Sequence, residues 1–286
     1  MSKAEIGLVA VFSTLLIILV LSGPEKPKKE PLPLYEYEQV LITENIETKS
    51  TADIITLDSV NVTPALYTGI KELEDLPVQE AKYRFIDIML PAILVARYEI
   101  AQDSIQIQEL RTKRPWNFSD SLFFESVSKR YKTTDTTELL VRLATHPNSL
   151  TLAQAAVESG WGKSRFFREA NNVFGVWSFN ENEPRIPASI RRKGYQVFLR
   201  KYDDVSGSVK HYFETLGRGS AYKSFRKARL TITDPFELSN HLIRYSERKE
   251  DYILQLKGMI DFNDFERYDT FRISPRYIVQ KPIIND

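Results

Sequence analysis

The stretch at residues 150–177 constrains the fold most, because its pattern predicts a helix together with the turn that ends it. Thr151, Gln154 and Glu158 fall three and four residues apart, so they share one face of a helix, while leucine, alanine and valine fill the other face. Ser149 or Thr151 can cap the start of this helix. The polar face therefore ends in one carboxylate, that of Glu158.

The position of Glu158 favours a neutral carboxyl group. Gly160 can adopt the left-handed conformation that ends a helix, which places Glu158 in the last turn. The helix dipole is negative at that end, and the neighbouring alanines exclude water, so both effects raise the pKa of the carboxyl. A carboxyl that stays neutral near pH 7 can donate a proton. The alternative is a surface ion pair between Glu158 and Lys163 or Arg165.

Two motifs in this stretch resemble a known family. AQAAVESGWGKSRF at residues 153–166, followed by NNVFGVW at residues 171–177, is similar to the signature of glycoside hydrolase family 73, the bacterial glucosaminidases. The upstream segment FIDIMLPAILVA at residues 85–96 resembles the Bax-type subgroup of bacterial proteins. The resemblance covers roughly residues 82–260. It implies a peptidoglycan hydrolase, an endo-β-N-acetylglucosaminidase without cofactors, whose general acid is Glu158.

The resemblance also implies a catalytic tyrosine. Tyr245, Ser246 and Tyr252 match the layout of the family, although Lys249 stands where a proline is usual. The phenol of Tyr245 can hydrogen-bond the N-acetyl group of the substrate or the attacking water. If the acetamido oxygen is the nucleophile, no second carboxylate is needed. The alternative for Tyr245 is a packing role, which is common for a tyrosine on a helix.

A second carboxylate is harder to place. Glu181 and Glu183 lie in the loop after residue 179, but residues 179–194 lack the recognisable acidic position of the family. Both glutamates can equally be solvated loop charges. They remain candidates without an assigned role.

Sugar rings are bound by aromatic faces and by polar side chains around the ring edge. Trp177 is the preferred sugar platform, whereas Trp161 follows a glycine and is expected to pack under Glu158 as a structural residue. The predicted substrate-binding residues are Trp177, Phe174, Asn171, Asn172, Gln154 and Tyr252.

Composition excludes several classes of function. Thirty-nine basic and thirty-eight acidic side chains leave no net field for nucleic acid, so no nucleic-acid partner is expected. The absence of cysteine excludes a disulfide framework, a thiolate zinc site and a thiol nucleophile. The three histidines lack ligand spacing, so no metal site is expected.

The N-terminal part predicts attachment to a membrane. Residues 6–21 are almost entirely apolar, so residues 1–23 are expected to be a transmembrane anchor or an uncleaved signal. Residues 24–78 begin with alternating proline and lysine and are expected to be a stalk and spacer, or an arm that binds a cell-envelope protein. Charge leans weakly towards a cytoplasmic body. The implied substrate favours a single-pass inner-membrane protein whose catalytic domain faces the periplasm.

The remaining chain predicts an α+β fold that is mainly α, a lysozyme-like helical domain with a small β-hairpin lobe. The domain is expected at residues 79–264 and an aperiodic tail at 265–286. Residues 79–111 are predicted to form one long helix or a helix pair that divides at Pro91. Further helices are predicted at residues 119–131, 135–144, 164–170, 204–216, 221–228, 235–245 and 250–262, and strands at 174–179 and 195–202. Two other functions remain open, a lytic transglycosylase or muramidase of lysozyme-like fold and a non-catalytic wall-binding scaffold.

Overall fold

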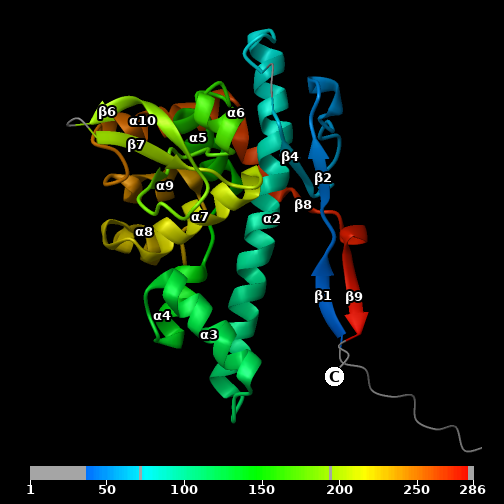
Figure 1. Cartoon of the computed structure of the whole chain (residues 1–286), viewed down its shortest axis with the longest axis vertical. Coiled ribbons are helices and arrows are strands. Elements are labelled where there is room, and N and C mark those ends of the chain that lie inside the picture. The colour runs from blue at the N-terminus through cyan, green and yellow to red at the C-terminus, as the bar shows by residue number, and fades with distance from the viewer. Residues whose placement is uncertain (1–36, 71–72, 193–194, 283–286) are drawn as a thin grey trace, which may run out of the picture. The chain divides into compact units, whose positions relative to one another are not determined.

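The computed structural model describes residues 37–70, 73–192 and 195–282, and it is mainly helical with small sheets (Figure 1). The helices are α2 (Val78–Thr112), α3 (Phe118–Tyr131), α4 (Thr136–Leu143), α5 (Asn148–Ser159), α6 (Arg165–Ala170), α7 (Val205–Arg218), α8 (Lys223–Ala228), α9 (Pro235–Ser239) and α10 (Glu250–Phe262), with 3₁₀ turns η1 (Thr51–Asp53), η2 (Ser220–Tyr222), η3 (Asn240–Leu242), η4 (Phe265–Thr270) and η5 (Pro275–Tyr277). The strands are β1 (Tyr37–Leu41), β2 (Glu44–Glu47), β3 (Asn61–Val62), β4 (Ala65–Thr68), β5 (Trp177–Ser178), β6 (Arg185–Arg192), β7 (Tyr195–Arg200), β8 (Arg272–Ile273) and β9 (Ile278–Pro282).

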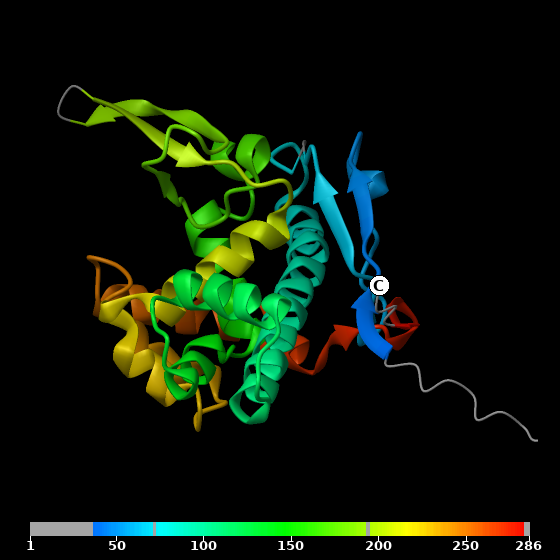
Figure 2. The ribbon, with the colours of Figure 1, turned by 60° about the horizontal axis from the view of Figure 1, so that its bottom comes forward.

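Helix α2 is the element around which the other helices pack. It is one continuous helix that contains Pro91, and the side chains of Ile86, Met89, Ile93 and Ile100 are buried along it. Two views show α2 between the β2–β4 pair and the helices α5 and α7 (Figure 1, Figure 2). Because both sides of α2 are covered, the middle of the helix is apolar almost all round rather than along one stripe.

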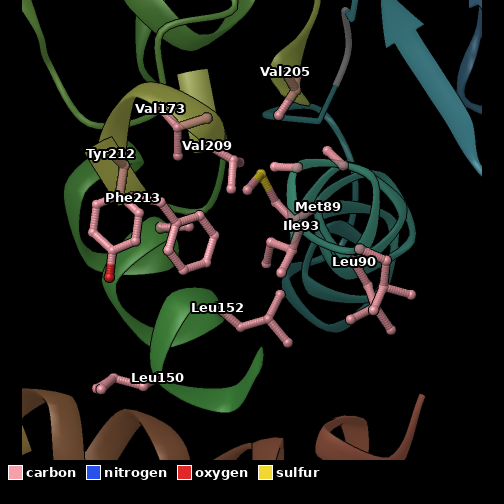
Figure 3. Close-up of a cluster of buried hydrophobic side chains, with 14 of the residues drawn as sticks. Met89, Leu90, Ile93, Leu150, Leu152, Val173, Val205, Val209, Tyr212 and Phe213 are labelled. Atoms are coloured by element: carbon pink, nitrogen blue, oxygen red, sulfur yellow. The ribbon is translucent and has the colours of Figure 1, made fainter. Parts of the chain in front are cut away.

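The core lies where α2, α5 and α7 meet (Figure 3). Met89 and Ile93 of α2 face Val209 and Phe213 of α7, and Leu152 of α5 closes the same cluster. This packing fixes the helix that carries Glu158 against the longest helix of the molecule, so the position of α5 is set by buried apolar contacts.

The hairpin lobe has one more strand than the sequence predicts. Its sheet has the order β5-β7-β6, and both pairs are antiparallel. Strand β6 lies in the segment expected to be a charged, proline-rich loop. A register shift between Pro187 and Arg191 interrupts its pairing, which explains why the alternation typical of a strand is not visible in the sequence.

The segment expected to be a spacer is packed against the helical body. Strand β2 pairs in parallel with β4, and β3 pairs in parallel with β8 near the other end of the chain. Tyr67, Ile70 and Leu73 are buried in the common core. The predicted aperiodic tail also contributes buried side chains, those of Phe265 and Tyr268. Residues Val40–Val279 therefore form one compact unit, wider than the domain expected at 79–264.

The remaining described residues belong to β1 and β9, which form a two-stranded sheet. Within residues 37–70, 73–192 and 195–282, no helix has both the length and the apolar character needed to cross a bilayer. The anchor expected at residues 1–23 lies outside the described residues.

Candidate active site

The start of α5 is held by the turn η4 and not by a cap of its own. The backbone N–H and the hydroxyl of Ser149 both donate to the Asp269 carboxylate at 2.7 Å, and the Asn148 amide donates to the Tyr268 carbonyl at 2.8 Å. The predicted caps Ser149 and Thr151 are thus wrong, because the helix begins one residue after Pro147 and Ser149 already lies inside it.

The end of α5 is a run of three left-handed residues. Gly160, Trp161 and Gly162 have φ values of 59°, 60° and 77°. The second glycine, Gly162, has no space for a side chain, because a Cβ atom there would come within 2.9 Å of Leu73 and 3.1 Å of Phe85. This turn and the segment that follows it pack on α2, where the rings of Trp161 and Phe167 contact Phe85.

Trp161 packs on α2 and η4. Its ring contacts Phe85 edge-on at 5.5 Å between centroids and Phe265 at 5.9 Å, and the Lys82 ammonium lies 4.7 Å from the ring. These contacts give Trp161 the structural role expected for it.

Glu158 lies at the boundary between the core and solvent. The residue is exposed, yet the tyrosines around it displace much of its water, and this burial raises the pKa of its carboxyl. The Tyr252 hydroxyl, which donates to Oε1 at 2.8 Å, and the Arg248 guanidinium oppose the rise without cancelling it. The surface pair with Arg165 is not formed, because Arg165 binds Glu169 instead.

Tyrosines surround the Glu158 carboxylate. Tyr245 lies in a turn and not on a helix, and its ring stacks on that of Tyr252 at 5.5 Å with 13° between the planes. The rings of Tyr212 and Tyr222 lie 6.5 and 6.0 Å from that of Tyr245. Burial, and after it the Glu158 charge, raises the pKa of Tyr245 well above its ordinary value. Tyr245 therefore remains a neutral hydrogen-bond donor.

Gln154 belongs to this cluster but does not reach the surface. It is fully buried, its amide nitrogen donates to the Tyr252 oxygen at 3.1 Å, and its amide oxygen accepts from the Tyr212 hydroxyl. The prediction that Gln154 binds substrate directly is corrected for this reason. Tyr252 is itself only 2% exposed, so it acts on Glu158 more than on a ligand.

The two asparagines predicted to bind sugar hold the hairpin lobe in place. Asn171 takes a left-handed conformation and donates to the carbonyls of Tyr202 and Asp203. Asn172 donates to the carbonyls of Val176 and Arg200 and accepts from the Val176 N–H. Both side chains are buried and their amide groups are engaged, so their role is structural and the sequence-based assignment is corrected.

The aromatic residues divide between the cluster and the lobe. Phe174 is half-buried and stacks on Tyr212 at 4.2 Å with 13° between the planes. Trp177 lies on the lobe, 41% exposed, with the exposed ring of Phe179 at 6.1 Å. Trp177 and Phe179 thus offer aromatic surface to a ligand, whereas Phe174 supports Tyr212.

The two hairpin glutamates differ from each other. Glu183 is bound by the Arg200 guanidinium at 2.5 Å. Burial tends to raise the pKa of Glu183, but hydrogen bonds from Ser178 and Arg200 outweigh it and lower the pKa overall. The Glu181 side chain is 87% exposed and lies 3.7 Å from Arg185. In the described residues, the charged group that acts on the Glu158 pKa is the Arg248 guanidinium and not a second carboxylate.

The described part of the chain holds no group of three or more His, Asp or Glu side chains placed to bind a metal ion. Glu158 and its tyrosines carry groups that can transfer protons and form hydrogen bonds.

A protein-family model matches the part of the sequence that contains these residues. The glucosaminidase model, described as mannosyl-glycoprotein endo-beta-N-acetylglucosaminidase, matches residues 134–265, which include Glu158, Tyr245 and Tyr252. Residues 134–265 are a glucosaminidase-family domain.

Two curated proteins are similar in sequence to part of this chain. Protein bax of Escherichia coli is 29% identical over 159 residues, which is 53% of this chain and 56% of the relative. Exo-glucosaminidase LytG of Bacillus subtilis is 23% identical over 145 residues, 48% of this chain and 51% of the relative. The chain thus spans about half the length of these curated relatives.

Solved structures with similarity to the chain include two hydrolase domains. The catalytic domain of the autolysin Auto from Listeria monocytogenes has a TM-score of 0.38 at 21% identity, covering 57% of this chain and 94% of that one. The truncated glycoside hydrolase domain of FlgJ from Salmonella typhimurium has a TM-score of 0.35 at 24% identity, covering 49% and 97%.

The glucosaminidase domain departs from the usual motif at Lys249, which precedes α10. Lys249 has φ 47° and ψ −113°. A proline ring holds φ near −65°, so a proline cannot adopt this conformation. The turn between Tyr245 and Tyr252 is therefore shaped differently from one that contains the proline.

Sequence reasoning missed several members of the cluster. Tyr212, Tyr222, Arg248 and His146 all lie within this network, but none has a local motif that marks it. Arg248 was the most accessible to prediction, because it lies between Tyr245 and Tyr252. The other three reach the site only through tertiary packing.

Proposed function

We propose that the protein is an endo-β-N-acetylglucosaminidase that cleaves the glycan strands of peptidoglycan, with Glu158 as the general acid. The observation that carries the proposal is the environment of Glu158 within the family-matched segment. Burial raises the pKa of its carboxyl, and a tyrosine hydroxyl holds one oxygen in place. A carboxyl with these properties is suited to protonate the leaving oxygen of a glycosidic bond.

The second catalytic function falls to the substrate in this proposal. Glu183 forms an ion pair with Arg200, and Glu181 is exposed to solvent, so neither carboxylate supports the role of nucleophile or base. The acetamido oxygen of N-acetylglucosamine can attack the anomeric carbon instead, which is a recognised route for glycoside hydrolases. Tyr245, neutral and next to Tyr252, is then a donor for that acetamido group.

Trp177 and Phe179 supply the sugar platform in the same proposal. Both rings are exposed on the hairpin lobe and lie 6.1 Å apart, and aromatic faces of this kind stack on the apolar side of a pyranose. Trp177→Ala is expected to raise KM for wall fragments about tenfold with little change in kcat, since it removes binding that is equal in ground and transition states.

Digestion of purified sacculi tests the main proposal. The full chain should release soluble fragments with N-acetylglucosamine at the reducing end, and Glu158→Gln should lower the rate at least about a hundredfold. Glu181→Gln is the matched control, because it removes an exposed loop carboxylate and should leave the rate unchanged. Undiminished release by Glu158→Gln would rule out Glu158 as the acid.

The products distinguish the neighbouring activities. Long internal fragments indicate endo cleavage, whereas single sugars indicate exo cleavage of the kind named for the LytG relative. Anhydro-muropeptides or muramic acid reducing ends would identify a lytic transglycosylase or a muramidase. Binding to sacculi without release, unaffected by Glu158→Gln, would instead identify a wall-binding scaffold.

We also propose that residues 1–23 anchor the protein in the inner membrane with the catalytic domain in the periplasm. The apolar run at residues 6–21 and the wall substrate support this placement. Protease added to spheroplasts should digest the body of the full chain, whereas a body protected until lysis would place it in the cytoplasm.

A further inference from the structure

A chain of hydrogen bonds runs through the core from His146 to Glu158. His146 Nε2 lies 3.0 Å from the Tyr212 hydroxyl, which donates to Gln154 Oε1 at 2.5 Å. Gln154 Nε2 donates to the Tyr252 oxygen at 3.1 Å, and the Tyr252 hydroxyl donates to Glu158 Oε1 at 2.8 Å. Four of the five groups in this chain are buried.

Elementary donor counting gives this chain a direction. A tyrosine hydroxyl has one hydrogen, so Tyr252 can donate to an ionised Glu158 only if its oxygen accepts from its other neighbour. That other neighbour is Gln154, which must therefore direct its NH₂ group to Tyr252 and its amide oxygen to Tyr212. Tyr212 donates to that oxygen, so its own oxygen accepts, and both His146 Nε2 and the Thr151 hydroxyl lie within reach of it. Every hydrogen between Tyr212 and Glu158 therefore points towards Glu158.

Gln154 alone among these groups has a fixed donor end and a fixed acceptor end. A hydroxyl can reverse its role by rotating about one bond, whereas an amide must turn over completely. The far end of the chain resists such a reversal. His146 Nδ1 has no hydrogen-bond partner, and a reversed chain in which Tyr212 donates to Nε2 would put a buried, unpaired N–H at that atom. Burial, with the Arg229 and Arg97 charges, lowers the pKa of His146, so the imidazole remains neutral.

We propose that Gln154 is a positioning residue that sets the direction of this chain and thereby aims the Tyr252 hydroxyl at the Glu158 carboxylate. Its significance for catalysis rests on the proposed function, but the chain itself is a property of the fold. Gln154 accepts from Tyr212 and so is a stronger donor to Tyr252, which in turn donates more strongly to Glu158. The ionised form of Glu158 is stabilised by this donation.

The other groups around Glu158 do not replace this effect. Arg248 from the turn before α10 also favours the ionised carboxylate, whereas burial opposes it. Tyr222 of η2, Tyr212 of α7 and Tyr245 are neutral, because burial and, after it, the Glu158 charge raise the pKa of each. Of the groups surrounding the carboxylate, Tyr252 is the one that both touches it and is oriented by an amide.

Measurement of the Glu158 pKa by ¹³C NMR of the side-chain carboxyl tests the proposal. Gln154→Met keeps the length of the side chain and removes both hydrogen bonds, so the pKa of Glu158 should rise. Tyr212→Phe removes the bond to the amide oxygen without changing residue 154, and the rise should be smaller. Ser149→Ala is the control, because Ser149 is a buried, hydrogen-bonded residue of α5 outside the chain, and the pKa should stay unchanged.

If the protein is a glucosaminidase, its activity should change most in Gln154→Met, less in Tyr212→Phe and not at all in Ser149→Ala. Glu158 must be protonated to act, so a raised pKa moves the alkaline limb of the pH–rate profile to higher pH. In Gln154→Met, kcat should fall about tenfold with KM within about twofold. An unchanged Glu158 pKa in both folded variants overturns the positioning role, and Tyr212→Phe decides alone if Gln154→Met does not fold. A raised pKa in a protein that releases no wall fragments overturns the proposed function only.

Discussion

At the scale of the residue, Glu158 shows how one carboxyl is tuned by opposing neighbours. Burial among tyrosines raises its pKa, and the Tyr252 hydroxyl and the Arg248 charge lower it again by a smaller amount. The carboxyl therefore holds its proton to a higher pH than a solvated glutamate does, while it remains exposed enough to meet a substrate.

Glu158→Gln should stabilise the protein at neutral pH. A raised folded-state pKa contributes stability below the unfolded-state pKa, near 4.5, and this contribution disappears as pH rises through the folded-state value. The neutral amide does not carry the cost of an ionised buried carboxylate. Thermal melts at pH 7.5 should show a higher Tm for the variant, and the difference should vanish near pH 4. A lower Tm for the variant at pH 7.5 would contradict this.

The two glycines beside Trp161 form a matched pair for mutation. Gly160→Ala meets open space and should cost about 1 kcal/mol from left-handed strain alone. Gly162→Ala has the same strain and also pushes a methyl group into Leu73 and Phe85, so the free energy of unfolding should fall by about 2–4 kcal/mol. Denaturant titration of both variants checks the difference, and equal losses would show that the packing around Gly162 is loose.

The sequence predicted those residues whose role depends on near neighbours. The left-handed Gly160 and the position of Glu158 in the last turn of α5 follow from local pattern. The roles of Gln154 and Asn171 do not, because their partners lie far along the chain. Gln154 contacts Tyr252, 98 residues away, and Asn171 contacts Tyr202, 31 residues away. The sequence shows that Gln154 lies on a polar helix face and Asn171 in a turn, but it does not show that both side chains are buried, so both were predicted to bind a ligand.

At the scale of the element, the hairpin lobe is attached to α7 through His211. The Tyr202 hydroxyl lies 2.6 Å from Nδ1 and Arg218 lies 2.7 Å from Nε2. Burial, followed by the charges of Arg200 and Arg218, lowers the pKa of His211 to about 4. A neutral imidazole thus links the end of β7 to the middle of α7.

Stability should fall in acid because of this histidine. The unfolded chain takes up the His211 proton near pH 6.5 and the folded chain only near pH 4, so the unfolded state binds more protons between these values. The free energy of unfolding should therefore decrease as pH falls from 6.5 to 4. His211→Gln should flatten that dependence in denaturant titrations, whereas His241→Gln should leave it in place. An equally steep dependence in His211→Gln would exclude this residue as its source.

The bounds of α10 and the start of α7 were predicted well, whereas the end of α9 and the strand β6 were not. Helix α10 has the predicted bounds, and α7 begins after Asp204 as expected, since the Asp204 carboxylate caps it. The helix expected at 235–245 ends early, at Ser239, and continues only as a 3₁₀ turn. Strand β6 was missed because Pro187 and a register shift hide its alternation.

At the scale of the whole molecule, the compact unit extends beyond the family-matched segment on both sides. Helix α2 and strands β2, β3 and β4 precede that segment, and β8 follows it. Charge alternation at residues 34–78 hides how much of this region is buried, so the sequence indicated a spacer where the structure has part of the core.

Substitution of Tyr67 should show that these strands belong to the core. Tyr67 is 1% exposed, and its hydroxyl accepts a hydrogen bond from the Ile55 N–H. Tyr67→Ala should lower the free energy of unfolding by about 3–5 kcal/mol, whereas Tyr67→Phe should lower it by about 1 kcal/mol. Denaturant titration of the full chain provides the measurement, and a near-neutral Tyr67→Ala would mean that the strands are only loosely attached.

The pairing of β3 with β8 has a consequence for the order of events during synthesis. Arg272 binds Asn61 across 211 residues of sequence, so the partner of β3 leaves the ribosome long after β3 itself. Contacts of such long sequence separation form late. The nascent chain must carry β3 without its partner strand until β8 has been synthesised, and the two ends of the compact unit join only after that point.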